Sequence, residues 1–446
     1  MRGSSLAHWR QYGLAALGAL ILAACSSGGD RGPVIAQPGK PSGSQDDPVF
    51  GPGGADAERR NRRGYIDPLH MQGEEPVRVA LLLPFTASSE SVQKVASAMF
   101  DAAQLAAFEV GDRKFLLIPK DTKGNAADAG LAARSALNDG AEIILGPLFA
   151  EEVSAVATEA RSQNVPMIAF SSDVASGGNG VYLLSFPPEL EISRVTEFAV
   201  SKGMSRFGLI APANTYGERV ASAFAEEIFV RGGVLVHEER YEQDPDKMLA
   251  PAKRLAQYAK EVVPAELRHG YDPKAPKDPA SSNGYTRGYQ AILIPEQGTL
   301  LRALAPLFPY YNVNINQIKL LGVSSWYNSR LTREPALKGG WFAAPDPAIT
   351  REFEGRFNAA FGQKPPRLAS LAYDATLLSA RLAQNPRKRG RFDVSSITDP
   401  NGYFGADGLF RLKPDGSVDR GLAVLEIQPD GFRTIDLAPR SFVPGS

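Results

Sequence analysis

Apolar runs alternate with segments of helical spacing from residue 77 onward. The run Val77–Pro84 is apolar apart from Arg78, as expected for a parallel strand that is covered on both faces. The same alternation continues to residue 321. We expect helices at 91–110, 126–137, 151–163, 189–202, 218–231, 247–260 and 299–307, and strands at 77–84, 115–118, 141–145, 166–170, 181–184, 207–210, 234–237, 291–294 and 318–321.

This alternation indicates βαβ units, whose right-handed crossovers build parallel sheets. The units are too numerous for one small sheet, and no linker-like break divides them. We therefore expect an α/β fold with two Rossmann-like lobes, joined by a hinge that the chain crosses several times. Lobe 1 is expected at about 76–188 and 323–400, and lobe 2 at about 189–322 and 401–440.

The C-terminal part carries turn signals instead of helical spacing. Phe404–Phe410 and Pro414–Gly416 are rich in Gly and Asp, and the apolar run 423–428 leads into Pro429–Gly431. Asp-Gly pairs between short apolar runs are typical of tight turns between antiparallel strands. The tail is therefore predicted to form β-hairpins.

The first 75 residues follow a different pattern. The apolar run from Gly13 to Leu22 follows two arginines; it is too short to span a bilayer but fits the apolar part of an export signal. The sequence Leu22-Ala23-Ala24-Cys25 resembles a bacterial lipobox. We expect residues 1–24 to be a signal peptide and Cys25 to carry the lipid, while an ordinary cleaved signal beside an incidental cysteine is the alternative.

The stretch 25–75 is rich in Gly, Pro, Ser, Asp and Arg and holds few apolar residues, so we expect a flexible tether. By resemblance to Gram-negative lipoproteins, Ser26 in place of an aspartate favours the outer membrane, with the protein facing the periplasm. Within the tether, Arg59–Arg63 either contacts anionic lipid or a partner, or is a solvated charge run.

Composition excludes several function classes. Lys plus Arg and Asp plus Glu number 49 each, so the chain offers no basic field for nucleic acid. One cysteine and four histidines provide neither an internal disulfide nor a recognisable metal site. The sequence has no P-loop, no G-x-S-x-G elbow and no C-x-x-C pair. We therefore expect no enzyme, no metal and no cofactor.

Several motifs together resemble the type I periplasmic-binding proteins of the leucine/isoleucine/valine-binding family, over about Val77 to Asp436. They are Ile144–Leu148, Asn164–Ile168 with Ser171-Ser172, Asn214–Gly217 and Phe404–Phe410. In addition, Leu184–Glu191 resembles a segment of penicillin-binding-protein activator lipoproteins, whose C-terminal domain has this fold.

The fold that this resemblance implies would place a ligand cleft at the carboxyl ends of the strands. Glycine permits close backbone approach, hydroxyls and helix N-terminal N–H groups can hold an anion, and aromatic rings can cover an apolar part. Each candidate has an alternative role in a turn or in the core. The residues expected to line the cleft are Phe85, Thr86, Ser88, Gly146, Pro147, Ser171, Ser172, Tyr216, Glu296, Ser324, Ser325 and Trp326.

The chain departs from the family at two places. The resemblance implies hydroxyls after the Gly146-Pro147 turn for a ligand's carboxylate, but Phe149–Glu152 follows, where an acid would repel that group. Where the family has an acid for the ammonium, Ser324 or Ser325 stands here, and Glu296 is a possible substitute. We therefore expect a ligand other than leucine, or a cleft that has lost its ligand.

Two non-catalytic functions stay open. The first is a regulator anchored to the outer membrane, whose tethered domain contacts an envelope partner such as a peptidoglycan synthase. The second is a receptor that closes on a small amino-acid-like or peptide ligand and delivers it to an ABC transporter. We prefer the regulator, because an inner-membrane transporter lies across the periplasm from the expected anchor.

The polar stretch 262–289 is unusually long for a connection between a helix and a strand. Helix-to-strand connections lie opposite the ligand cleft in this fold. The stretch is therefore expected either to contact a partner or to be a tolerated surface excursion.

Overall fold

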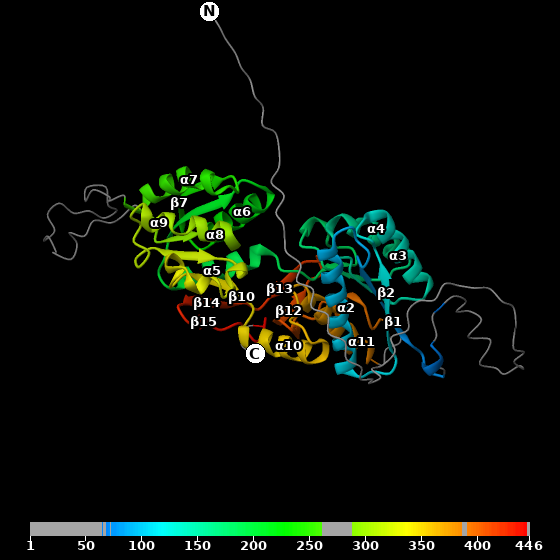
Figure 1. Cartoon of the computed structure of the whole chain (residues 1–446). Coiled ribbons are helices and arrows are strands. Elements are labelled where there is room, and N and C mark those ends of the chain that lie inside the picture. The colour runs from blue at the N-terminus through cyan, green and yellow to red at the C-terminus, as the bar shows by residue number, and fades with distance from the viewer. Residues whose placement is uncertain (1–64, 66–67, 72, 261–287, 386–389, 444–446) are drawn as a thin grey trace, which may run out of the picture. The chain divides into compact units, whose positions relative to one another are not determined.

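Two large sheets organise the described chain, the first parallel and the second mainly parallel (Figure 1). The computed structural model describes residues 65, 68–71, 73–260, 288–385 and 390–443. The expected signal peptide, Cys25, Arg59–Arg63, most of the tether and nearly all of the 262–289 stretch lie outside the described residues.

The first sheet has β1 (Val77–Leu83) inside it and the strand order β2-β1-β3-β4-β5, all parallel. Both faces of β1 are buried because its side chains alternate between two helical layers. Val79 and Leu81 face α2 and α11, whereas Ala80 and Leu82 face α3 and α4. The other elements are β2 (Phe115–Asp121), β3 (Ile143–Leu145), β4 (Met167–Ala169), β5 (Val181–Leu183), α2 (Glu90–Val110), α3 (Ala126–Asn138), α4 (Ala150–Ser162) and α11 (Ala369–Ala383).

The second sheet has seven strands in the order β15-β14-β10-β9-β8-β6-β7. Its strands from β6 to β10 are parallel, whereas β14 and β15 run antiparallel to their neighbours. One face packs on α5 and α6, and the other on α7, α8 and α9. These elements are α5 (Pro188–Ser201), β6 (Arg206–Pro212), α6 (Thr215–Val230), β7 (Val234–Tyr241), α7 (Pro245–Gln257), β8 (Ala291–Leu293), α8 (Gly298–Leu304), α9 (Leu307–Tyr310), β9 (Lys319–Gly322), β10 (Trp341–Ala344), β14 (Ala423–Gln428) and β15 (Gly431–Asp436).

A small antiparallel sheet of β11 (Tyr403–Gly405), β12 (Gly408–Leu412) and β13 (Val418–Arg420) precedes the last hairpin. Phe410 and Val418 of this small sheet pack into the core of the first lobe. The expected C-terminal hairpins are therefore confirmed.

The two-lobed α/β fold is confirmed, but the lobe boundaries differ from those expected. Strand β10 pairs in parallel with β9, with Trp341 opposite Leu321, so the chain stays in the second lobe to about residue 344 instead of 323. Because the small sheet packs on the first lobe, the chain re-enters the second lobe near residue 421 instead of 401. The helix expected at 299–307 divides at Pro306 into α8 and α9.

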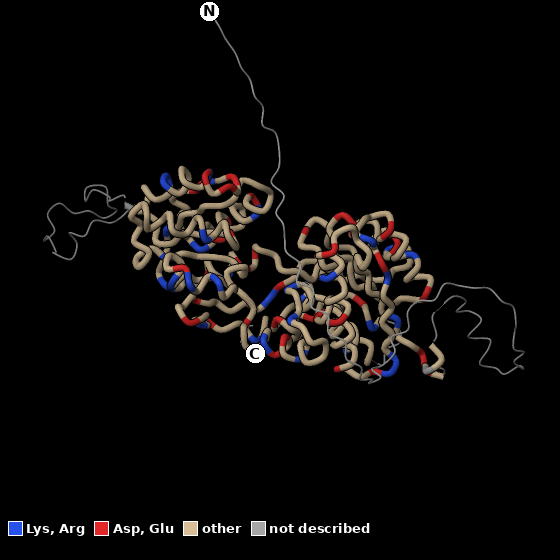
Figure 2. The backbone as a smooth tube through the Cα atoms, in the orientation of Figure 1, with Lys and Arg blue, Asp and Glu red and all other residues tan. Residues whose placement is uncertain are grey.

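Charge is dispersed over the described residues. Lys and Arg are interspersed with Asp and Glu along the tube of Figure 2, consistent with the balance in the sequence. Among the described helices, none is long and apolar enough to cross a membrane. The described part of the chain also holds no cluster of three or more His, Cys, Asp or Glu residues suited to a metal ion.

Candidate functional site

A cavity of about 580 Å³ lies at the carboxyl ends of strands from both lobes. Most of its wall comes from residues that follow β6, β7, β8 and β9 in the second sheet. Ser172, which follows β4, and Arg367, which precedes α11, come from the first lobe. The cavity is lined by Ser172, Phe186, Pro188, Glu191, Tyr216, Arg219, Gln243, Pro295, Glu296, Gln297, Val323, Ser324, Ser325, Tyr327 and Arg367.

Glu296 is the first acid of this wall and is only 4% exposed. Its carboxylate accepts hydrogen bonds from the Tyr241 hydroxyl at 2.6 Å, from Gln243 Nε2 at 3.3 Å and from the Gln297 backbone N–H at 2.9 Å. Burial and the hydrogen bond to Glu296 raise the pKa of Tyr241, so the phenol keeps its proton and donates it. Glu296 is therefore held in a fixed position as a buried acceptor.

Glu191 is the second acid and lies in the first turn of α5. Its two carboxylate oxygens accept from the Ser324 backbone N–H at 2.8 Å and from Ser324 Oγ at 2.6 Å. Burial raises the pKa of Glu191 to about 7, although both hydrogen bonds from Ser324 act in the opposite direction. This carboxyl group therefore keeps its proton to a higher pH than an ordinary glutamate does.

Tyr216 lies in the first turn of α6, and the charged groups around the cavity affect the pKa of its hydroxyl. Burial raises the pKa of Tyr216 most strongly, and Glu191, Glu296 and Glu189 raise it further, while Arg219 opposes them. Acids thus outweigh cations around this hydroxyl. This side of the cavity favours a cationic or hydrogen-bond-donating group of a ligand.

Arg219 connects the two lobes across the cavity. From α6, its Nε donates to Glu189 Oε1 at 2.9 Å, and its Nη2 donates to the backbone carbonyl of Ser172 in the first lobe at 3.3 Å. Arg219 therefore already donates hydrogen bonds to one acceptor in each lobe.

Five of the twelve residues expected from the sequence line this cavity: Ser172, Tyr216, Glu296, Ser324 and Ser325. The other seven do not line it: Phe85, Thr86, Ser88, Gly146, Pro147, Ser171 and Trp326. The wall of this cavity therefore comes mainly from residues that follow strands of the second lobe.

Trp326 is a core residue instead of a cleft aromatic. Its side chain is fully buried, packs near Phe342 and donates from Nε1 to the backbone carbonyl of Glu296 at 3.2 Å. A side chain at Gly322 would meet the indole at 2.2 Å, so the strand makes room for this ring. Trp326 thus supports the loop that carries Glu296.

The glycine at position 146 is required by close packing against the neighbouring strand β1. A Cβ on Gly146 would meet the backbone carbonyl of Leu82 at 2.2 Å, so the close approach is to β1. After this turn, the buried carboxylate of Glu152 accepts from the Phe149 backbone N–H at 3.3 Å and caps α4. Nearby, Thr86 Oγ1 donates to Asp121 at 2.5 Å. These groups are occupied by structural contacts.

Several lining residues were absent from the expected set. Phe186 and Glu191 belong to Leu184–Glu191, a segment noticed for its resemblance and not for its chemistry. Arg367 lies in a stretch where the sequence pattern assigned no element. Tyr327 and Gln243 follow strands, and the carboxyl-end rule applied to every loop of the second sheet would have included them.

Comparisons with known proteins agree on the fold. The family model described as periplasmic binding protein matches residues 76–260. A putative branched-chain amino acid ABC transporter from Rhodospirillum rubrum superposes with a TM-score of 0.65 at 16% identity, covering 81% of this chain and 100% of that one. The substrate binding protein LivJ from Streptococcus pneumoniae, solved with isoleucine, superposes with a TM-score of 0.53 at 15% identity, covering 82% and 100%.

The penicillin-binding protein activator LpoA from Vibrio cholerae is a curated relative by sequence. It is 28% identical over 173 residues, which are 37% of this chain. The match spans only 27% of that protein's length.

Periplasmic binding proteins are typically non-enzymatic, in agreement with the expectation that this chain is not an enzyme. The parallel sheets, the structural neighbours and the family match therefore identify the described domain as a type I periplasmic-binding-protein fold, with distant and partial similarity to the LpoA activators.

Proposed function

We propose that this chain binds a small amino-acid-like solute in the cavity and serves as the substrate-binding component of an ABC transporter. The cavity carries the proposal: its volume of about 580 Å³ is in the usual range for small-molecule sites, and fixed polar groups line it. The fold shared with a receptor that was solved with isoleucine supports it.

The receptor now ranks above the regulator, whereas the sequence alone favoured the regulator. The receptor structures cover more than four-fifths of the chain, whereas the activator match covers 37% of it. In the proposed complex, Glu296 and the hydroxyls of Ser324 and Ser325 receive the ligand's ammonium or other donors. Phe186 and Tyr327 contact its apolar part.

A regulator of peptidoglycan synthesis is the second candidate, and the similarity to the activator over 173 residues favours it. In this case the chain would be lipid-anchored through Cys25 to the outer membrane, face the periplasm, and contact a peptidoglycan synthase. The two candidates differ in the role of the cavity: a receptor must bind its solute there, whereas a regulator can stimulate a synthase with the cavity empty.

The test is calorimetric titration of the purified protein with the twenty L-amino acids, short peptides and peptidoglycan fragments. We expect at least one amino acid to bind, and Glu296→Gln to weaken that binding about 10-fold to 100-fold, because a charge-assisted hydrogen bond is lost. Glu238→Gln is the control, since Glu238 lies on β7 outside the cavity and pairs with Arg240 at 3.1 Å.

Binding of no amino acid would contradict the receptor. Stimulation of a purified bifunctional penicillin-binding protein by both the wild type and Glu296→Gln would then favour the regulator.

A further inference from the structure

Arg367 is the cation that the first lobe presents to the cavity. It lies two residues before α11, and its side chain is 41% exposed. This location differs from the Gly146 turn, to which the family resemblance assigned the carboxylate of a ligand.

The guanidinium of Arg367 is held on one side by protein groups. Its Nη1 donates to Asp407 Oδ1 at 2.6 Å, and the Asp407 side chain is fully buried. The same nitrogen lies 3.4 Å from Ser370 Oγ. The guanidinium carbon lies 3.6 Å from the ring centroid of Phe186, which is a cation–π contact. The cation is therefore oriented before a ligand arrives, which lowers the entropic cost of binding.

The other side of the guanidinium has unused donors. Within the described residues, Nε and Nη2 of Arg367 make no hydrogen bond. The nearby acid Glu191 interacts with Arg367 electrostatically, but its two oxygens accept from Ser324. Nε–H and Nη2–H together form the planar fork that matches the two oxygens of a carboxylate.

We propose that Arg367 is the anion-binding residue of this cavity and that the ligand carries a carboxylate, which Nε and Nη2 bind in a bidentate arrangement. A carboxylate fits better than a phosphate, because Glu191 and Glu296 stand in the same cavity and repel a second negative charge. The ligand then spans from an anionic end at Arg367 to a donor end at Glu296. This inference rests on the proposed function, and it names the class of solute.

A titration of the wild-type protein tests the anion site without knowledge of the natural ligand. The probes are acetate, its neutral analogue acetamide, and inorganic phosphate, and the readout is the NMR signal of the arginine Nε–H groups. We expect acetate to shift the Arg367 signal in a saturable way and acetamide to leave it unchanged. The control signal is that of Arg302, whose Nε is bonded to Glu334 outside the cavity. An Arg367 signal that behaves as Arg302 does, or that responds more strongly to phosphate, overturns the proposal.

Affinity provides a second readout, with the tightest-binding L-amino acid of the calorimetric titration and its α-amide as probes. We expect the amide to bind at least 10-fold more weakly than the free amino acid. Arg367→Gln should weaken binding of that amino acid about 30-fold, and Arg367→Lys about 10-fold because the planar fork is lost while the charge stays. Arg302→Gln should bind it as the wild type does.

Equal binding of both probes, or normal binding by Arg367→Gln, overturns the role of Arg367 while the receptor function stands. If the wild type binds no amino acid, the receptor function fails, and the acetate titration still decides whether Arg367 holds a carboxylate.

Discussion

Both oxygens of Glu191 accept hydrogen bonds from Ser324, yet burial raises the pKa of this carboxyl group to about 7. Arg367 and Arg420 are the nearby cations, and they lower the pKa only in part. Burial therefore outweighs the groups that favour the charged form. In the folded protein the proton stays bound at pH values where an unfolded glutamate, with its ordinary pKa of 4.5, has lost it.

Glu191 should therefore make the protein less stable as the pH rises from about 4.5 to 7. The stabilisation from the bound proton is present below pH 4.5 and is lost by about pH 7, and it amounts to about 3 kcal/mol. Burial and Asp407 also raise the pKa of Asp374, so the comparison must be made against Glu191→Gln, which retains Asp374. Urea unfolding at pH 4.5 and pH 8 should show the wild type losing about 3 kcal/mol relative to Glu191→Gln. Parallel pH profiles of the two proteins would contradict the assignment.

At this scale, sequence reasoning found the residues that follow a recognisable strand. Glu296, Ser324 and Ser325 come directly after β8 and β9, so the carboxyl-end rule located them. Arg367 follows no strand, and its place in the cavity depends on Asp407, which is 40 residues away in the sequence. No local pattern contains that contact, so only the folded chain reveals it.

Among the elements, α6 packs unusually close to β6 through Gly217. Asn214 caps the helix by accepting from the Gly217 backbone N–H at 2.9 Å, and a Cβ on Gly217 would meet the Pro212 carbonyl at 1.8 Å. Gly217→Ala should therefore displace the start of α6, which carries Tyr216, and lower the free energy of unfolding by about 2–3 kcal/mol. Denaturant unfolding measures this cost.

The matched control is Gly355→Ala in the middle of α10 (Pro347–Phe361), where an added Cβ meets no atom within 4 Å. This substitution should stabilise the protein by about 0.5–1 kcal/mol, because alanine loses less backbone entropy in a helix than glycine. Destabilisation of similar size in both variants would show that close packing at Gly217 is not the cause.

The elements found from the sequence were those with a clear signal, either a helical period as in α2 or a continuous apolar run as in β1. Helix α11 was missed because every residue from Ala369 to Ala380 is buried, so it has no exposed polar stripe to mark a helical period. Strand β10 is only four residues long. It belongs to the second lobe because it pairs with β9 and β14, which are separated from it by 18 and 78 residues of sequence. The assignment of α11 and β10 and the positions of the lobe boundaries therefore depend on tertiary contacts.

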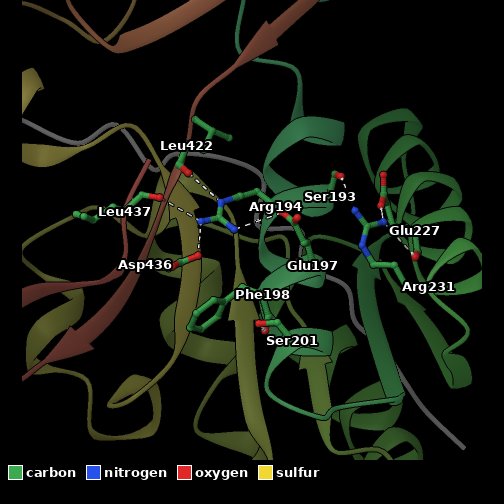
Figure 3. Close-up of polar contacts among 10 residues, drawn as sticks. All are labelled: Ser193, Arg194, Glu197, Phe198, Ser201, Glu227, Arg231, Leu422, Asp436 and Leu437. Atoms are coloured by element: carbon green, nitrogen blue, oxygen red, sulfur yellow. Dashed lines mark hydrogen bonds and ion pairs between the residues drawn. The ribbon is translucent and has the colours of Figure 1, made fainter. Parts of the chain in front are cut away.

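At the scale of the whole molecule, the chain passes between the lobes after β5, after β10 and between β13 and β14. Hydrogen bonds connect the first crossing segment to the third, once near the first lobe and once near the second. Arg420, which is almost fully buried, donates from Nε to the Ser185 carbonyl at 2.6 Å. Arg194 on α5 donates from Nε to the Leu422 carbonyl at 2.9 Å and also pairs with Asp436 (Figure 3). Two arginines thus hold the crossing segments together.

Removal of the Arg194 contacts should loosen the C-terminal hairpin, because this guanidinium holds both the start of β14 and the end of β15 (Figure 3). Arg194→Met should lower the free energy of unfolding by about 2 kcal/mol, because the buried Leu422 carbonyl loses a charged donor and the half-exposed Asp436 carboxylate loses its partner. The control is Arg231→Met: Arg231, also in Figure 3, pairs with Glu227 one turn away, and such a pair contributes less than about 1 kcal/mol.

Hydrogen exchange locates the effect. Faster exchange in β14 and β15 of Arg194→Met, with α6 unchanged, would show that this arginine secures the last two strands of the second sheet. Equal losses of stability in the two variants would instead mean that bridging distant segments adds nothing beyond an ordinary helix ion pair. The third crossing would then depend on Arg420 and on the apolar packing of Leu425 and Ile427 in the second-lobe core.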